Sequence, residues 1–289
     1  MTAVRPLLDD ATRQLSAAGV GSPRVDAELL LAHCLGVERS RLAVMDDVDP
    51  VTAQAFAAVV DRRAAREPLQ HIVGRAAFRY LDLAVGPGAF VPRPETELLV
   101  DAIRPGLGPR LGLGPGVGLG EAPIVVDLCA GTGALALAIA HEVPGARVYA
   151  VERSAAALAW LRRNTAGTDV TVVEGDVADD GILSDLHGRV DAVVSNPPYV
   201  PAGTPVDPEV RADPDEAVFA GDDGLGVIPN VIARAQALLR PGGVLALEHD
   251  DTHGEAVPAL LGDGWRDVAD HRDLAGRPRY ATAVRAGAR

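Results

Sequence analysis

Apolar residues recur at helical spacing over the first 75 positions of the chain. They return every three or four positions across residues 7–18 and 27–35, and an alanine-rich stretch of similar character covers 51–66. This period is that of amphipathic helices, and Asp26 stands where it can cap the start of the second one. The pattern therefore predicts a small N-terminal helical domain over residues 1–75.

Residues 76–92 show a different, alternating pattern. Aromatic and apolar residues alternate with others from Phe78 to Val85, and a Gly-Pro-Gly sequence occupies 86–88 before a second apolar pair. This arrangement is typical of a β-hairpin. We expect the hairpin to link the helical domain to the rest of the chain, with a short helix starting at Thr96.

Residues 105–120 contain seven glycines and three prolines, and we interpret them as a flexible surface insertion without a function of its own. Beyond this insertion, apolar strand candidates alternate with helix candidates, which predicts a largely parallel, Rossmann-like, seven-stranded sheet in an α/β domain over 93–289. Ligands of such folds bind at the carboxyl ends of the strands. The strand candidates are Ile124–Leu128, Arg147–Val151, Val170–Glu174, Ala192–Ser195, Gly243–Leu247, Trp265–Val268 and Arg279–Val284, and the helix candidates are Ala134–His141, Ala155–Asn164, Asp179–Leu186 and Ile228–Leu239.

The composition excludes several kinds of chemistry. All 27 basic residues are arginine, so the chain has no Schiff-base lysine, no P-loop lysine and no lysine general base. The 40 acidic residues give a formal net charge of −13, which argues against a broad surface for duplex DNA. Nearly all of this charge lies after residue 85, because the first 85 residues carry 11 acidic and 10 basic side chains.

The cysteines and histidines do not suggest a metal site. Cys34 and Cys129 are the two cysteines, and no Cys-x-x-Cys occurs. His249 and His253 have the i, i+4 spacing of a helical metal pair, but the residues around them have the character of a loop. The start of the chain lacks the apolar core of a signal peptide, and the most apolar window is broken by a charge and two glycines. We expect a cytoplasmic protein with no metal and no membrane contact.

A glycine-containing turn follows the first predicted strand of the α/β domain. It reads Asp127-Leu128-Cys129-Ala130-Gly131-Thr132-Gly133 and runs straight into a helix. Glycines allow the backbone to approach a ligand closely, and a helix N-terminus favours anionic groups. Two glycines are fewer than the dinucleotide fingerprint requires, so a tight structural turn is the alternative interpretation.

Acidic residues end the next two predicted strands. Glu152 lies 19 positions after Gly133, where a carboxylate can accept hydrogen bonds from both ribose hydroxyls. A helix cap is the alternative role for Glu152, although Ser154 is also placed to cap that helix. Asp176 closes the third strand and can reach an adenine amino group, with Val177 packing on the ring. Three strand-end sites in succession predict a nucleoside pocket.

The fourth predicted strand ends in Ser195-Asn196-Pro197-Pro198-Tyr199, the most specific motif of the chain. Prolines lack the backbone N–H, and the Asn196 side chain adds an acceptor oxygen. A planar NH₂ group can therefore donate one hydrogen to Asn196 and the other to the Pro197 carbonyl, which leaves its lone pair directed out of the plane. Tyr199 offers an aromatic face for a planar substrate. A proline-stiffened turn with a solvent-facing asparagine is the alternative interpretation.

This combination resembles class I S-adenosylmethionine-dependent methyltransferases that modify planar amide or amino nitrogens. The resemblance implies S-adenosyl-L-methionine as the cofactor and in-line displacement at its methyl group. Positioning is the main contribution of the protein to such a reaction, and no lysine or histidine base is required.

A narrower resemblance, to the HemK/PrmC family of protein-glutamine methyltransferases, covers almost the whole chain. It implies that the substrate is the glutamine amide in the Gly-Gly-Gln motif of peptide chain release factors. It also implies that the N-terminal helical domain helps to dock that protein. The motifs that carry the resemblance are 67–74, 91–97, 196–201, 213–217, 221–225, 247–248, 254–257 and 272–277.

The resemblance also implies roles for individual residues. Asn196, Pro197, Pro198 and Tyr199 hold the substrate amide, and Arg93 and Glu95 lie beside it, although a purely structural role for the prolines around Arg93 is equally open. The cofactor is held by residues of the glycine turn and of the strand ends. The family usually has glycine where Cys129 stands and Ile-Gly where His249-Asp250 stand. The implied cofactor residues are Asp127, Cys129, Ala130, Gly131, Thr132, Gly133, Glu152, Asp176, Val177 and Asn196.

Two other functions are weighed against this one. An adenine-specific DNA or RNA methyltransferase can use the same Asn-Pro-Pro-Tyr motif on an exocyclic amino group, but the acidic charge and the missing basic target-recognition region argue against it. A non-catalytic nucleotide-binding module is disfavoured because the acceptor motif is intact. We therefore expect a monomeric translation-termination enzyme without stable nucleic-acid binding.

Overall fold

The computed structural model describes residues 1–104 and 122–287, which form two compact units. The N-terminal unit contains residues 1–75 together with 85–87 and 206–212. The other described residues form the α/β unit. The interpretation of 105–120 as a flexible insertion concerns positions outside the described residues.

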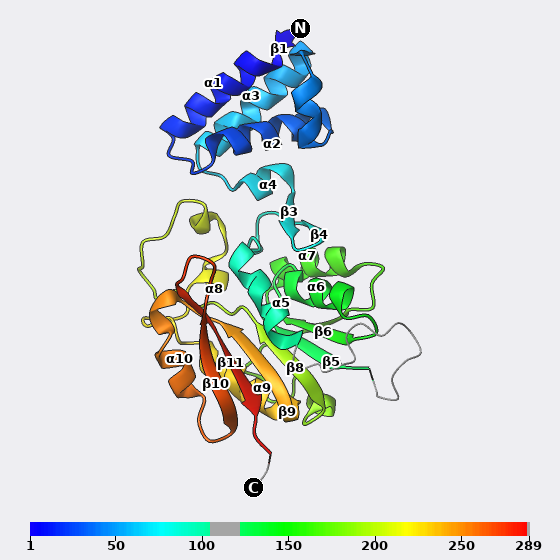
Figure 1. The fold of residues 1–289 in the computed structure, drawn as a ribbon, viewed down its shortest axis with the longest axis vertical. Coiled ribbons are helices and arrows are strands. Elements are labelled where there is room, and N and C mark those ends of the chain that lie inside the picture. The colour runs from blue at the N-terminus through cyan, green and yellow to red at the C-terminus, as the bar shows by residue number, and fades with distance from the viewer. Residues whose placement is uncertain (105–121, 288–289) are drawn as a thin grey trace. The chain divides into compact units, whose positions relative to one another are not determined.

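The N-terminal unit is a bundle of helices around an apolar core (Figure 1). Leu15, Leu30 and Phe56 are fully buried in it. Asp26 does not cap a helix as predicted: α2 begins at Pro23, and the buried Asp26 carboxylate accepts a hydrogen bond from Arg63 at 2.7 Å. The elements are β1 (Thr2–Ala3), α1 (Val4–Ala17), α2 (Pro23–Leu35), the 3₁₀ helix η1 (Arg39–Val44), β2 (Asp47–Val48), α3 (Pro50–Ala64) and α4 (Leu69–Val73).

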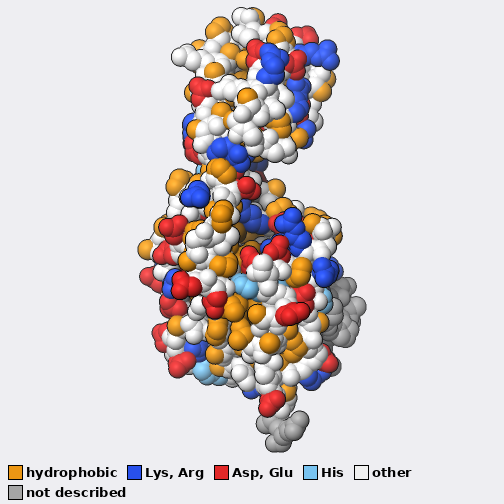
Figure 2. Space-filling model, turned by 90° about the vertical axis from the view of Figure 1, so that its left-hand side faces the viewer, with side chains coloured by type: hydrophobic (Ala, Val, Ile, Leu, Met, Phe, Trp, Pro, Cys, Tyr) orange, Lys and Arg blue, Asp and Glu red, His pale blue; other side chains and the backbone are white. Residues whose placement is uncertain are grey.

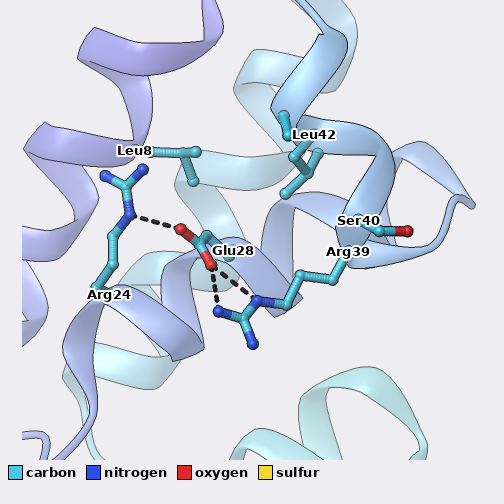
Figure 3. A pocket seen from close by; sticks show the side chains of 7 residues that line it. Leu8, Arg24, Glu28, Arg39, Ser40 and Leu42 are labelled. Atoms are coloured by element: carbon cyan, nitrogen blue, oxygen red, sulfur yellow. Dashed lines mark hydrogen bonds and ion pairs between the residues drawn. The ribbon is translucent and has the colours of Figure 1, made fainter.

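The charges of the N-terminal unit are largely paired with one another. Figure 2 shows arginine and acidic side chains interspersed over this unit. A hollow of about 530 Å³ is lined by apolar side chains together with Arg24, Glu28 and Arg39. Figure 3 shows Glu28 pointing between the two arginines, which donate to it at 2.7 and 2.8 Å. Arg24 also pairs with Asp9 at 2.8 Å, so two carboxylates offset the two guanidinium charges that line this hollow.

The hairpin between the helices and the sheet is shorter than predicted. It pairs β3 (Arg75–Phe78) with β4 (Leu81–Ala84), so the chain reverses at Arg79-Tyr80 instead of at 86–88. Arg79 adopts a positive φ of 52°, and its backbone N–H and side chain bond to acidic residues of the α/β unit, including Glu97 and Asp101. These long-range contacts hold a turn that no glycine or proline marks in the sequence.

A seven-stranded, mostly parallel sheet forms the centre of the α/β unit, which confirms the predicted fold (Figure 1). The strand order is β10-β11-β9-β8-β5-β6-β7. The last five strands are parallel, and β11 runs antiparallel to both of its neighbours, β9 and β10. The order of chain progression reverses between β5 and β8, which is where α/β sheets bind ligands. The strands are β5 (Ile124–Leu128), β6 (Arg147–Glu152), β7 (Thr171–Glu174), β8 (Val190–Ser195), β9 (Leu239–Glu248), β10 (Trp265–Arg272) and β11 (Pro278–Arg285).

Helices pack against this sheet. One predicted helix is wrong: residues 179–186 contain only the 3₁₀ turn η4 (Ser184–Leu186). The side chains of Asp176 and Asp179 accept hydrogen bonds from backbone N–H groups two residues ahead, which stabilises turns in competition with a helix. No helix among the described residues has the length and apolar character needed to cross a bilayer. The helices are α5 (Leu98–Ile103), α6 (Ala134–Glu142), α7 (Ala155–Thr165), α8 (Asp215–Val218), α9 (Ile228–Leu238) and α10 (Ala256–Leu260), with the 3₁₀ helices η2 (Pro94–Glu97), η5 (Val210–Ala212) and η6 (Asp251–His253).

Candidate active site

The register of the parallel strands brings the predicted site segments to one edge of the sheet. Leu128 at the end of β5 pairs with Val151 in β6 and with Ser195 in β8, and Ser195 pairs with Leu247 in β9. The Ser195 hydroxyl also donates to the Leu128 carbonyl at 2.7 Å. The residues that follow these positions therefore leave the sheet at the same level, although they come from four separate parts of the chain.

The glycine turn after β5 has a backbone that favours glycine at three positions. Gly131 and Gly133 have φ values of +55° and +88°, and Cys129 has a φ of 64°. A Cβ atom at Gly133 would lie 2.6 Å from Leu161 Cδ1, whereas one at Gly131 would meet nothing within 4 Å. Gly133 is therefore favoured by its positive φ and by the nearby Leu161 side chain. The space above Gly131 lets a ligand approach the backbone, as the predicted cofactor role needs.

Glu152 ends β6 with its carboxylate fixed against backbone N–H groups. Its Oε2 atom accepts from Gly131 N and its Oε1 atom from Arg153 N and Ser154 N, all at 2.8 Å. The Ser154 side chain makes no capping hydrogen bond to α7. The carboxylate therefore joins the glycine turn to the start of α7. A carboxylate has about four lone-pair sites, and three are used here, so acceptor capacity remains for a ribose hydroxyl.

Asp127 is buried and Cys129 is partly buried near this carboxylate. Asp127 is 1% exposed; its Oδ2 atom accepts from Ala136 N at 3.1 Å, and its Oδ1 atom has no donor among the described residues. Burial, with a further effect of the Glu152 charge, raises the pKa of Asp127 well above its ordinary value. The same two causes raise the pKa of the Cys129 thiol. Cys129 is therefore a packing residue rather than a thiolate nucleophile.

Asp176 and Val177 follow β7, the outermost strand on this side of the sheet. The Asp176 carboxylate accepts from Ala178 N at 2.9 Å and from Arg153 Nη1 at 3.1 Å, and these two groups lower its pKa in that order. Val177 is 7% exposed and belongs to the core cluster under the sheet. Each of these side chains already has a partner within the protein. The adenine contacts expected of both residues therefore stay predictions.

The Asn-Pro-Pro-Tyr loop, residues 196–199, leaves β8 beside the glycine turn. Pro197 and Pro198 are buried, and Asn196 is partly exposed. The Asn196 Nδ2 atom donates to Thr96 Oγ1 at 3.0 Å, and within residues 1–104 and 122–287 no hydrogen bond to Asn196 Oδ1 is formed, so this oxygen can accept one. A Cβ atom at Gly224 would lie 2.3 Å from the Tyr199 carbonyl oxygen, so glycine is required there for the downstream chain to pack on this loop.

The loop ends on a buried carboxyl group that the sequence did not assign to the site. Tyr199 Oη donates to Glu248 Oε1 at 2.9 Å, and Glu248 is 1% exposed at the end of β9. Burial raises the pKa of Glu248 to about 7, against the lowering effect of hydrogen bonds from Thr96 and Tyr199. Thr96 and Glu248 both lie in the motifs that carry the family resemblance. Their contact with the loop was not predictable, because they come from separate parts of the chain.

Arg93 and Glu95, expected beside the substrate, occupy the segment that carries Thr96. Arg93 Nη2 lies 2.5 Å from Asp213 Oδ2, and its guanidinium sits 4.9 Å from the centre of the Phe90 ring. Burial raises the pKa of Asp213 to about 6, although Arg93 acts to lower it. The charge of Arg93 is therefore engaged within the protein. Substrate contacts of Arg93 and Glu95 remain predictions.

The two spaced histidines make separate contacts. His249 Nε2 lies 3.0 Å from Asp270 Oδ1, and His253 Nε2 lies 2.9 Å from the Asp223 carbonyl oxygen. Burial lowers the pKa of His249. Over residues 1–104 and 122–287, no group of three or more His, Cys, Asp or Glu side chains is arranged to hold a metal ion.

Solved structures share the architecture of the α/β unit. A methyltransferase from Pyrococcus furiosus has a TM-score of 0.50 and 19% identity, covering 73% of this chain and 92% of its own. The hMettl16 catalytic domain, solved in complex with the MAT2A 3′UTR hairpin 6, has a TM-score of 0.51 and 13% identity, covering 71% and 75%. The sheet order is that of the class I S-adenosylmethionine-dependent methyltransferase fold.

Full-length relatives define the family within this class. The release factor glutamine methyltransferases of Mycolicibacterium smegmatis and Streptomyces coelicolor are 51% and 50% identical, covering 99% and 96% of both chains in each comparison. The chain belongs to the release factor glutamine methyltransferase family. Two family models match as well: the PrmC N-terminal domain over residues 6–74 and the methyltransferase small domain over residues 119–210.

Proposed function

We infer that this chain transfers a methyl group from S-adenosyl-L-methionine to the side-chain amide nitrogen of a glutamine in peptide chain release factors. Membership of the family supports this activity. The observation that carries the inference is the free Asn196 Oδ1 atom, presented at the sheet edge beside the glycine turn. We place the glutamine in the Gly-Gly-Gln motif and the enzyme in the cytoplasm, as the sequence predicts.

The cofactor is proposed to lie over the ends of β5, β6 and β7. The open backbone at Gly131, the remaining acceptor capacity of Glu152 and the unpartnered oxygen of Asp127 support this placement. S-adenosyl-L-methionine supplies an electrophilic methyl group, and S-adenosylhomocysteine is the product that leaves. The role of the protein is to fix the acceptor in line with that methyl group, since orientation alone lowers the barrier of such transfers substantially.

The glutamine amide is proposed to donate its two N–H hydrogens to Asn196 Oδ1 and to the Pro197 carbonyl. Both groups are acceptors, and the two prolines remove backbone N–H groups that would compete. The nitrogen lone pair then points out of the amide plane toward the methyl carbon. As the N–C bond forms, the C–S bond breaks, and one amide proton is released to solvent. Tyr199 is proposed to pack against the planar amide, with its hydroxyl anchored on Glu248.

The N-terminal unit is proposed to help dock the release factor. Its match to the PrmC N-terminal domain supports a role particular to this family. Docking contacts away from the glutamine would add binding energy that a short peptide cannot supply. We therefore expect kcat/KM for intact release factor to exceed that for a Gly-Gly-Gln peptide by about tenfold or more. Equal values would argue against a docking role.

The proposed activity is tested with labelled S-adenosylmethionine and three acceptors. The purified protein is incubated with release factor, with DNA and with RNA, and the labelled site is mapped by peptide mass spectrometry. We expect label on the glutamine of the Gly-Gly-Gln motif and none on nucleic acid. Label on adenine without label on release factor would replace this proposal with the nucleic-acid alternative.

A further inference from the structure

The two ends of the Asn196 carboxamide have nearly the same shape but opposite hydrogen-bonding character. Oδ1 accepts and Nδ2 donates, so the orientation of this amide decides what the Asn-Pro-Pro-Tyr loop can bind. With Oδ1 facing the substrate, Asn196 and the Pro197 carbonyl both accept, and an NH₂ group fits. With Nδ2 facing the substrate, the same place would receive a carboxylate oxygen instead.

Thr96 is the neighbour that distinguishes the two ends of this amide. Asn196 Nδ2 donates to Thr96 Oγ1 at 3.0 Å, across 100 positions of sequence. Thr96 is 4% exposed and lies in η2, where its backbone N–H donates to the Arg93 carbonyl at 3.2 Å. The ion pair of Arg93 with Asp213 holds this segment in turn. The hydroxyl that receives Asn196 is therefore buried and fixed in position.

Glu248 explains why the Thr96 oxygen accepts rather than donates toward Asn196. Tyr199 donates a hydrogen bond to the Oε1 atom of this buried carboxyl group. The Oε2 atom accepts no hydrogen bond from the residues that the structure describes. Hydrogen bonding from Thr96 acts to lower the pKa of Glu248, opposing the larger effect of burial. When Glu248 is ionised, above its pKa of about 7, it only accepts hydrogen bonds. The Thr96 hydroxyl hydrogen then points toward Glu248, which leaves the Thr96 lone pairs for Asn196.

We propose that Thr96, oriented by Glu248, is a positioning residue that keeps Asn196 Oδ1 turned toward the substrate and so makes the loop selective for a glutamine amide over a glutamate carboxylate. This inference rests on the proposed function, because it concerns the same acceptor site. Thr96 does not touch the reacting atoms; it acts through Asn196. A substrate carboxylate would meet only acceptor oxygens from Asn196 and Pro197, and the unpaired charge would be repelled.

The first test compares Thr96→Val with Thr96→Ser. Valine keeps the volume and removes the hydroxyl, which leaves Asn196 Nδ2 without a fixed partner, whereas serine keeps the hydroxyl. We expect Thr96→Val to lower kcat on release factor by roughly 10- to 100-fold, the effect of leaving one partly buried donor unpaired. Thr96→Ser should restore most of the activity, and the Kd for S-adenosylmethionine should stay unchanged in both variants. Wild-type kcat in Thr96→Val would overturn the inference.

The second test measures selectivity without turnover. The Kd values of Gly-Gly-Gln and Gly-Gly-Glu peptides are compared in the presence of S-adenosylhomocysteine. The wild-type protein should prefer the glutamine peptide, and Thr96→Val and Glu248→Gln should each reduce that preference by about tenfold or more. A residue that only packs would weaken both peptides equally, and an unchanged preference in a folded variant would overturn the inference. Glu248→Gln provides this readout even if Thr96→Val does not fold.

A double-mutant cycle isolates the role of amide orientation. Asn196→Asp has two acceptor oxygens and no donor end, so no orientation needs to be fixed. The Thr96→Val substitution should therefore cost at most about twofold in glutamine-peptide binding when residue 196 is aspartate. Equal costs in both backgrounds would show that Thr96 acts by packing alone. Absence of release factor methylation by the wild-type protein would instead refute the proposed function itself.

Discussion

The hydroxyl of Tyr199 donates to the carboxyl of Glu248 at 2.9 Å, which joins the end of the Asn-Pro-Pro-Tyr loop to the end of the neighbouring strand β9. Glu248 is buried and Tyr199 is partly buried. Burial raises the pKa of Glu248 to about 7 and raises that of Tyr199 well above its ordinary value. A titratable carboxyl group is thus hydrogen-bonded to the last residue of the loop.

Replacing Glu248 should change the pH dependence of stability. Its pKa is about 7 in the folded protein against 4.5 in the unfolded chain, so the folded state binds the extra proton. The stabilisation is complete below pH 4.5 and is lost as the pH rises through 7, an effect of about 3 kcal/mol. Urea unfolding at pH 5 and pH 8 should therefore show Glu248→Gln gaining stability relative to wild type at the higher pH. The exposed Glu255→Gln variant is the control, and parallel curves for Glu248→Gln and wild type would contradict the assignment.

Replacing Asn196 should separate substrate positioning from cofactor binding. Asn196→Ala removes the acceptor oxygen proposed to hold the glutamine amide, and we expect kcat to fall by roughly 100-fold or more. Calorimetric binding of S-adenosylmethionine should remain close to wild type. The exposed Asn230→Ala substitution in α9 serves as the matched control. Near-normal turnover of Asn196→Ala would refute its role in holding the amide.

The role of Glu152 is tested against its register partner. Glu152 and Glu174 are paired across β6 and β7, but Glu174 forms an exposed ion pair with Arg162. Glu152→Gln removes the charge that is proposed to bind ribose hydroxyls, so the Kd for S-adenosylmethionine should rise by about 10- to 100-fold. Glu174→Gln should leave that Kd within about twofold, since exposed ion pairs contribute little. Equal effects of the two substitutions would argue against a ribose contact.

Glu209 should stabilise the N-terminal unit at neutral pH. Burial acts to raise its pKa, but hydrogen bonds from Arg66 and Arg63 outweigh burial and lower the pKa to about 2. Because the folded pKa is depressed below 4.5, this stabilisation is present above pH 4.5 and is lost as the pH falls toward 2. Glu209→Gln should therefore be less stable than wild type by about 1–3 kcal/mol at pH 7.

Denaturant unfolding at pH 7 and at pH 3 checks this expectation. The stability difference between Glu209→Gln and wild type should shrink at the lower pH, where wild-type Glu209 begins to take up its proton. The exposed Glu216→Gln variant should track wild type at both values. A stability difference that is the same at both pH values would mean that the variant loses packing rather than charge.

Local sequence patterns were enough to predict most of the succession of strands and helices in the α/β unit. Apolar runs such as Ile124–Leu128 are bounded by glycine turns and charged residues, so local periodicity is sufficient to predict them. Parallel strands then place Glu152 and Asn196 at one edge of the sheet, because carboxyl ends of parallel strands coincide. The methyltransferase fold and the site segments were predictable for this reason.

Which side chains come into contact depends on the folded arrangement of the whole chain. The contact of Thr96 with Asn196 and the perturbed carboxyl of Glu248 depend on burial and on pairing across the chain, neither of which has a local period. The grouping of residues 206–212 with the N-terminal helices also depends on long-range pairing. Glu209 bonds to arginines that lie more than 140 positions earlier in the chain. Local patterns determine the order of helices and strands along the chain. Long-range packing determines which atoms of the site donate hydrogen bonds and which accept them.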